Sequence, residues 1–127
     1  MNQLDSYQTA CLAAGLLDDK KAKDIVILDI SRVSVIADFF VICWTDTSTQ
    51  LKAISEVVLK DLKTKYNKLP LREERDARGK WYLIDFGDVI IHIMHKEDRN
   101  FYAIEKFWSH AFVVDKEDWE KEFKKAS

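Results

Sequence analysis

The sequence predicts a single α/β domain whose mixed β-sheet is flanked by helices. Two short runs rich in β-branched residues, 24–30 and 38–45, have the composition of strands that are covered on both faces. Two more strand-like runs, 80–86 and 89–95, are separated by Gly87-Asp88, a pair typical of a two-residue hairpin turn. Helical periodicity precedes, separates and follows these strands, and an alternation of this kind indicates the α/β class.

The two long helices have recognisable start and stop signals. Apolar residues recur near the helical period over residues 2–17, which predicts the first helix. The second helix is expected to begin at Thr47-Ser48, because small hydroxyl residues cap helix N-termini. It should run out near Tyr66, since Asn67 and Pro70 interrupt helices.

Three further segments complete the predicted domain organisation. Residues 71–79 are strongly charged and are expected to form a mobile connection. A helix starting at Glu97 or Asp98 is expected to continue to about His110 and to turn a stripe of apolar residues toward the core, namely Phe101, Ile104 and Trp108. The domain proper should cover residues 1–112, leaving 113–127 as a C-terminal extension that is either a short helix or partly frayed.

Length, composition and charge bound the possible functions. The chain has 127 residues, of which 47% are apolar and 33% charged, with a formal net charge of −2. A nearly balanced charge argues against nucleic acid, and in particular against direct sequence-specific binding, as the main interaction. No apolar run approaches the roughly 18 residues of a membrane span, and residues 1–8 lack the pattern of a secretion signal. The expectation is a soluble cytoplasmic protein with no membrane partner.

The cysteines and glycines carry little catalytic signal. Cys11 and Cys43 lie in apolar surroundings, which favours buried free thiols over a disulfide or a nucleophile. Phosphate-binding loops need closely spaced glycines, whereas Gly15, Gly79 and Gly87 are far apart. The sequence therefore predicts neither a dinucleotide-binding loop nor a P-loop, and no cofactor.

Histidines on the second hairpin strand raise the question of a metal site. His92 and His95 are three residues apart, and side chains alternate between the faces of a strand, so the two should point in opposite directions. A metal site is therefore not expected. His92 is better explained as a buried or half-buried histidine whose ring nitrogens form hydrogen bonds.

Acidic and aromatic residues around the hairpin turn leave two alternatives open. Asp85 and Asp88 could form a carboxylate pair for acid–base or metal chemistry, but aspartates also flank tight turns because they bond nearby amides. We favour turn chemistry or partner contact over catalysis. Trp81 and Phe86 fit a core or an interface equally well from their residue types alone.

Several blocks of this chain resemble the ribosomal silencing factor family, also called the Iojap family. The blocks are KAKDIVILDIS, ADFFVIC, STQLKAI and WYLIDFGDVIIHIMHKEDRNFYAIEKFW. The last block is similar to the family pattern at Trp81, Asp85, Gly87, Asp88, Val89, His92, Arg99, Tyr102, Glu105 and Trp108, with Ile104 in place of a leucine. The resemblance extends from about Lys20 to Trp108 and leaves the tail after Ala111 outside it.

The chain departs from the family pattern after its second strand. Thr45 stands where the family usually has a glycine, and Thr49 where an arginine is common. These departures put in question a backbone geometry that needs glycine and a contact made by the arginine.

The resemblance implies a fold, a function and a partner. The fold would have a nucleotidyltransferase-like topology without the catalytic site. The function would be non-enzymatic: binding to the large ribosomal subunit through its ribosomal protein fourteen, which sterically blocks subunit association and represses translation when nutrients are limiting. The residues expected to bind the ribosomal protein are Trp81, Asp85, Phe86, Gly87, Asp88 and His92. An acidic turn with apolar flanks would suit a basic protein surface.

Two rival functions and one oligomeric state complete the expectations. The chain could be a divergent nucleotidyltransferase-like enzyme that uses Asp85 and Asp88 on a metal-bound nucleotide, or an assembly factor of the large subunit. The resemblance also implies a homodimer in the free state. Residues 89–94 are apolar on both sides, so if this strand lay at a sheet edge, a symmetric partner could cover it with the hairpin face that binds the ribosome.

Overall fold

The computed structural model describes residues 4–96 and 110–126. This part of the chain forms a six-stranded mixed sheet and three helices, which confirms the predicted fold class. The elements in chain order are α1 (Ser6–Asp19), β1 (Lys23–Asp29), β2 (Phe39–Thr45), α2 (Ser48–Tyr66), β3 (Arg72–Arg75), β4 (Trp81–Asp85), β5 (Val89–His95), β6 (Phe112–Val114) and α4 (Lys116–Ala126). None of the described helices is both long and apolar enough to cross a membrane.

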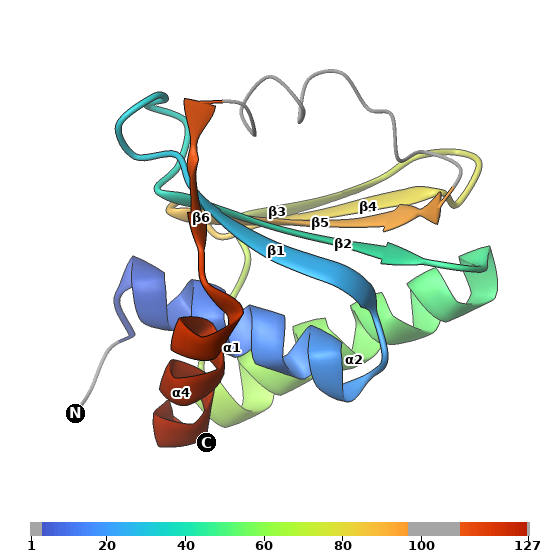
Figure 1. Ribbon diagram of the computed structural model, residues 1–127. Helices are drawn as coiled ribbons and strands as arrows, with labels where there is room; N and C mark the ends of the chain where they lie inside the picture. The colour runs from blue at the N-terminus through green and yellow to red at the C-terminus, as the bar shows by residue number, and fades with distance from the viewer. Residues whose placement is uncertain (1–3, 97–109, 127) are drawn as a thin grey trace.

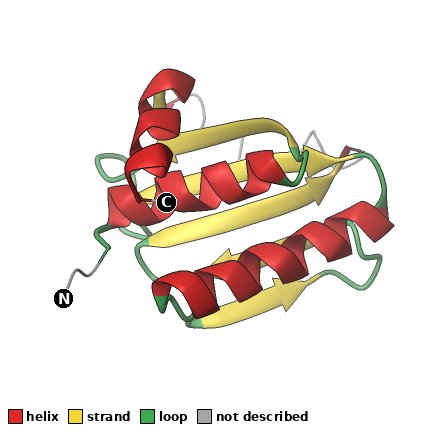
Figure 2. Cartoon of the chain, turned by 90° about the horizontal axis from the view of Figure 1, so that it is seen from below, coloured by secondary structure: helices red, strands yellow, loops and turns green. Residues whose placement is uncertain are grey.

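The sheet has the strand order β3-β4-β5-β2-β1-β6, and its two central strands run parallel to each other. Every residue of β2 and of β5 is buried, as expected for strands covered on both faces. β1 is less buried than its sequence predicts, because its first two residues are exposed and its pairing with β2 is irregular there. The described helices all lie on the same face of the sheet (Figures 1 and 2).

The hairpin of β4 and β5 has the predicted two-residue turn. The amide of Phe86 donates to the carbonyl of Val89 at 2.9 Å, which closes the turn around Gly87-Asp88. Gly87 has φ +93°, a conformation that glycine adopts without steric cost and that the first position of a type II′ turn requires. The turn therefore fixes the register in which Asp85 pairs with Ile90.

The helix boundaries follow local capping chemistry. Asp5 caps α1 in a reciprocal arrangement with Gln8, so the helix begins four residues later than its periodicity predicts. Thr47 caps α2 by accepting from the Gln50 amide at 3.0 Å, as predicted. Asn67 ends this helix in the left-handed region with φ +54°.

The charged segment after α2 was predicted to be a mobile connection, and this prediction is wrong for residues 72–75. Arg72–Arg75 form β3, an edge strand that pairs antiparallel with β4. All four residues are exposed, so no apolar alternation marks the strand in the sequence. Charged residues are instead typical of edges, where they discourage pairing with other chains.

Strand β5, for which the sequence suggested a dimer partner, does not lie at an edge of the sheet. β5 is hydrogen-bonded to β4 on one side and to β2 on the other. The premise that residues 89–94 present unpaired backbone groups is therefore wrong, because the parallel pairing with β2 buries this strand in the centre of the sheet. The edges of the described sheet are β3 and β6.

The C-terminal residues form regular structure that joins the rest of the fold. β6 pairs with β1, and α4 packs on α1 with Trp119 only 2% exposed. The ring of Phe123 lies against Gly15, where a Cβ atom would come within 2.2 Å of it. The expected domain boundary after residue 112 thus falls inside β6. The helix expected between residues 97 and 110 lies almost entirely outside the described residues.

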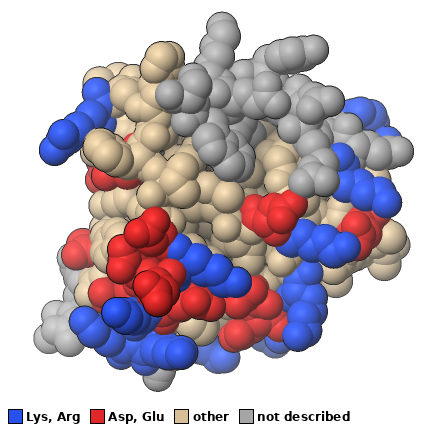
Figure 3. All heavy atoms as spheres, viewed as in Figure 1, with Lys and Arg blue, Asp and Glu red and all other residues tan. Residues whose placement is uncertain are grey.

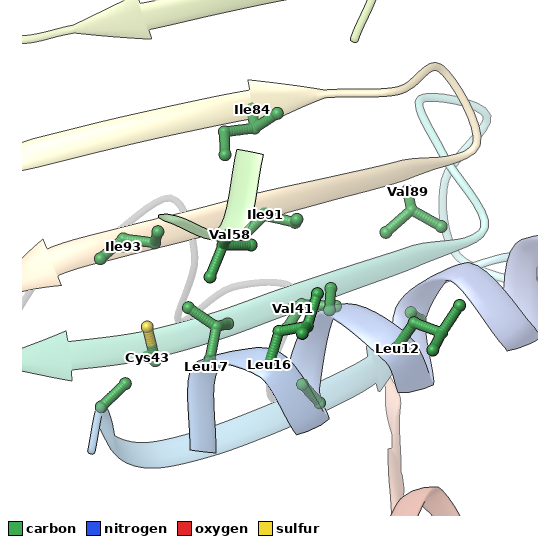
Figure 4. Packing of buried hydrophobic residues seen from close by; sticks show 14 of the residues in the cluster. Leu12, Leu16, Leu17, Val41, Cys43, Val58, Ile84, Val89, Ile91 and Ile93 are labelled. Atoms are coloured by element: carbon green, nitrogen blue, oxygen red, sulfur yellow. The ribbon is translucent and has the colours of Figure 1, made fainter. Parts of the chain in front are cut away.

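Two apolar clusters occupy the two faces of the sheet. The larger one lies between the sheet and the helices, where α1 directs Leu12 and Leu17 at β2 (Figure 4). The smaller one lies on the opposite face and contains Leu28, Ile30, Ala37, Phe40, Ile42, Trp44, Ile90 and Met94. Cys11 and Cys43 are buried free thiols, as predicted, and burial raises the pKa of Cys11 to about 11.

Candidate functional site

The candidate residues of the hairpin are divided between the two faces of the sheet. Phe86, which directly follows β4, is 8% exposed and belongs to the cluster between the sheet and the helices, together with Tyr82 and Ile84 of that strand. Trp81 packs against the cluster on the opposite face and is half-buried. Phe86 is therefore a core residue, and of the two aromatic candidates only Trp81 is available to a surface.

Trp81 forms a pair with His92 on the face away from the helices. The Trp81 indole Nε1 donates to Nδ1 of His92 at 3.3 Å, and the two ring centroids lie 5.8 Å apart. Phe40 packs its ring edge-on against the imidazole, with centroids 4.8 Å apart. The imidazole is thus held by an aromatic ring on either side.

The hydrogen bond from Trp81 determines where the imidazole carries its proton. Because Nδ1 accepts, the neutral ring has its hydrogen on Nε2. Nε2 is buried and has no hydrogen-bond partner among the described residues. The prediction that both ring nitrogens of His92 form hydrogen bonds is therefore correct for Nδ1 and wrong for Nε2 among these residues. Burial lowers the pKa of His92 to about 4, against the opposing influence of Asp85, so the ring is neutral near pH 7.

The turn aspartates mainly organise the backbone and the sheet edge. Asp85 accepts from the Gly87 amide at 2.7 Å and from Nε of Arg72 at 2.9 Å. The main-chain carbonyl of Asp88 accepts from the amides at the start of β2, at 2.8 Å from Asp38 and 3.2 Å from Phe39. The contacts of the Asp85 carboxylate support turn chemistry for this residue, and the guanidinium of Arg72 offsets its negative charge. The contacts of Asp88 are made by its main chain, and its carboxylate Oδ1 is buried without a hydrogen-bond partner among the described residues.

Trp81 and the turn lie at opposite ends of the hairpin. Four residue steps separate Trp81 from Asp85, which corresponds to about 13 Å along a strand. A partner that contacts both must therefore lie along the length of β4. His92 and His95 face opposite sides of β5, as the strand alternation predicts.

The two departures from the family pattern have clear structural settings. Thr45 is buried at the end of β2, its hydroxyl donates to the Thr47 carbonyl at 3.2 Å, and its φ is not positive. The backbone at this position therefore does not need glycine. Thr49 is exposed in the first turn of α2 and lines a cavity beside Trp81. Arg99, Tyr102, Glu105 and Trp108 lie outside the described residues.

This cavity lies between the start of α2 and the end of the β3–β4 hairpin, and no sequence pattern predicts it. Its residues come from two segments, 48–55 and 75–82, and local sequence patterns carry no information on how closely two such segments approach each other. On the surface seen in Figure 3, acidic and basic side chains are intermixed, so charge on that face does not single out one partner class.

Comparison with known proteins identifies relatives along the whole chain. The profile of the family described as ribosomal silencing factor during starvation matches residues 3–127. This match includes the tail, so the expectation that the resemblance stops near Ala111 is wrong. A ribosomal silencing factor of Halalkalibacterium halodurans is 39% identical over 106 residues, covering 84% of this chain and 90% of that protein.

A solved structure and a more distant relative agree with this match. A crystal structure of a Chromobacterium violaceum protein has a TM-score of 0.76 and 31% identity, and the match covers 84% of this chain and 88% of that one. A mouse protein named mitochondrial assembly of ribosomal large subunit protein 1 is 30% identical over 101 residues, covering 77% of this chain and 44% of that protein. Profile, sequence and fold thus agree, and the chain belongs to the ribosomal silencing factor family.

Proposed function

We propose that this protein represses translation by binding the large ribosomal subunit through ribosomal protein fourteen, in the cytoplasm, when nutrients are limiting. Bound at the face where the small subunit docks, it would block subunit association sterically and without catalysis. The observation that carries this proposal is family membership over residues 3–127. The names of its relatives agree with a role on the ribosome.

The contact surface in this proposal is the hairpin face that carries Trp81. Half-buried aromatic residues are frequent anchors of protein interfaces, because they bury a large area at low entropic cost. His92 would hold the indole in place from behind, while Asp85, Gly87 and Asp88 would contact the partner at the far end of β4. Phe86 would contribute by supporting the hairpin from its buried side.

Sedimentation with separated subunits tests the proposal directly. The purified protein should pellet with large subunits and not with small ones, and should bind isolated ribosomal protein fourteen. Added to a mixture of both subunits, it should lower the yield of joined ribosomes. Equal sedimentation with both subunits, or with neither, would contradict the proposal.

A second candidate function is assembly of the large subunit. The name of the mouse relative, which refers to assembly of the large subunit, favours it. An assembly factor should bind precursor large subunits more tightly than mature ones, whereas a silencing factor should bind mature subunits and inhibit their joining. Sedimentation with precursor and mature particles, run side by side, separates the two functions.

The enzyme alternative has weaker support at the hairpin turn. A nucleotidyltransferase would need Asp85 and Asp88 to bind a metal-bound nucleotide, yet Asp85 already accepts from Arg72 and Gly87. A thermal melt with nucleotides and Mg²⁺ tests this alternative, because a ligand stabilises the state that it binds. A rise in melting temperature that requires both Mg²⁺ and Asp85 would support an enzyme.

We propose further that the free protein is a homodimer. Of the two edges of the described sheet, β6 is the apolar one: Phe112 is 68% exposed and Val113 is 52% exposed. Light scattering across a dilution series measures the oligomeric state. If the dimer used the same face as the ribosome, a covalently cross-linked dimer would lose binding to large subunits.

A further inference from the structure

A cavity of about 290 Å³ opens beside Trp81, on the side of the hairpin that faces α2. It lies between the first turns of α2 and the end of the β3–β4 hairpin, and it is lined by Ser48, Thr49, Leu51, Lys52, Ser55, Arg75, Asp76, Gly79, Trp81 and Tyr82. Its volume is close to the lower end of the range for small-molecule sites. A ligand of modest size could therefore enter it.

The cavity combines an apolar wall with two cationic side chains. Leu51 and Tyr82, which are 4% and 1% exposed, supply aliphatic and aromatic surface. Lys52 and Arg75 are exposed residues that contribute to the same lining. Neither of them forms an ion pair with a carboxylate in the part of the chain that the structure describes.

The guanidinium of Arg75 is held in position by an aromatic ring. Its Cζ atom lies 4.6 Å from the centre of the Tyr82 ring. The Tyr82 hydroxyl donates to the carboxylate of Glu73, and burial together with Glu73 raises the pKa of Tyr82 to about 12, so the phenol remains neutral. An arginine stacked in this way loses less side-chain freedom when it binds an oxyanion.

The one carboxylate that lines the cavity is already engaged. Asp76 accepts from the main-chain amide of Lys80 at 2.8 Å and from Nη2 of Arg78 at 2.8 Å, both within the turn between β3 and β4. Asp76 therefore shapes the turn and is balanced by Arg78. The charge left for a ligand is that of Lys52 and Arg75.

We propose that this cavity binds a small organic oxyanion, a carboxylate or a phosphate monoester attached to an apolar or aromatic body. The anionic group would contact Arg75 and Lys52, since charge-assisted hydrogen bonds are the strongest that these side chains form. The apolar body would lie against Leu51 and Tyr82. This site lies on the helix side of β4, whereas the proposed ribosome contact is the opposite face, where the Trp81 indole pairs with His92.

Titration with model compounds tests the proposal without ribosomes. Phenyl phosphate and phenylacetate represent the two oxyanions, inorganic phosphate lacks the apolar body, and benzyl alcohol lacks the charge. Nuclear magnetic resonance should show saturable shifts of the Gly79 and Tyr82 amides with the two charged aromatic compounds. The oxyanion that binds more tightly identifies the ligand class. Equal binding of inorganic phosphate or of benzyl alcohol would overturn the proposal.

Matched variants locate the binding site. Lys52→Gln and Arg75→Gln should each weaken binding by about tenfold or more, the effect of losing one charge-assisted hydrogen bond. Lys60→Gln on the same helix and Arg32→Gln in the β1–β2 loop remove an exposed charge away from the cavity and should leave binding unchanged. Thermal melts confirm that each variant is folded. If all four variants bind as the parent protein does, the cavity is not the site.

Discussion

The two faces of strand β4 differ more than its sequence suggests. Toward the helices, Tyr82, Ile84 and Phe86 are at most 8% exposed, whereas Trp81 and Asp85 on the other face remain half-buried. Residues adjacent in the chain therefore have unrelated roles. The helix side stabilises the hairpin, and the opposite side is the part that a partner could contact.

The largest expected effect tests the buried side. Phe86→Ala should lower the free energy of unfolding by about 3–5 kcal/mol, because it removes a large ring from the packed cluster beneath the helices. Chemical denaturation measures this change. Leu83→Ala, on the half-buried face of the same strand, is the control and should cost about 1 kcal/mol. Equal losses would show that the two faces do not differ in this way.

The second prediction concerns the face of the sheet away from the helices, where His92 should make the stability depend on pH. His92 has a folded-state pKa of about 4, below the value of about 6.5 for an unfolded histidine. The unfolded state therefore binds the proton first as the pH falls. The stabilising contribution of the neutral ring is fully present above about pH 6.5 and is lost progressively as the pH falls toward 4, to a total of about 3 kcal/mol.

Denaturation across this pH range should compare the parent protein with His92→Asn. The variant should show a flatter profile between pH 6.5 and 4, whatever its absolute stability. A profile as steep as that of the parent would mean that other groups cause the dependence.

Local patterns explain which parts of the fold could be predicted. The cap at Thr47, the end of α2 at Tyr66 and the Gly87-Asp88 turn each depend on residues within four positions, and all were predicted correctly. The alternation of side chains also places Trp81 and Phe86 on opposite faces, because they are an odd number of positions, five, apart in the chain. Treating these two aromatics as one surface overlooked that rule.

Long-range contacts explain what could not be predicted. β3 has no apolar side chain, so only its pairing with β4 identifies it as a strand. The packing of α4 depends on the absence of a side chain at Gly15, more than a hundred residues from Phe123. The cavity likewise requires α2 and the β3–β4 turn to meet. For α4 and the cavity the determining neighbour is remote in sequence, whereas β3 depends on pairing with the next strand of its own hairpin.

The third prediction concerns binding through the exposed face. Trp81→Ala should weaken binding to large subunits by about 1–4 kcal/mol, the range for an aromatic anchor at an interface. Stability should fall less than in Phe86→Ala, because Trp81 is only half-buried. Circular dichroism and thermal melts accompany the binding assay. If binding decreased only in proportion to the loss of folded protein, Trp81 would be a structural residue as well.

The prediction with the smallest expected effect tests whether α4 packs against α1 on the helix-covered face of the sheet. A methyl group at Gly15 would overlap the ring of Phe123, so Gly15→Ala should destabilise by about 1 kcal/mol, although alanine favours the helix. In a Phe123→Ala background the overlap is absent, and the same substitution should be neutral or stabilising. A double-mutant cycle measured by denaturation gives the coupling between the two positions. Strictly additive effects would mean that α4 does not pack against α1 at this point, and that the helix-covered side of the sheet consists of α1 and α2 alone among the described helices.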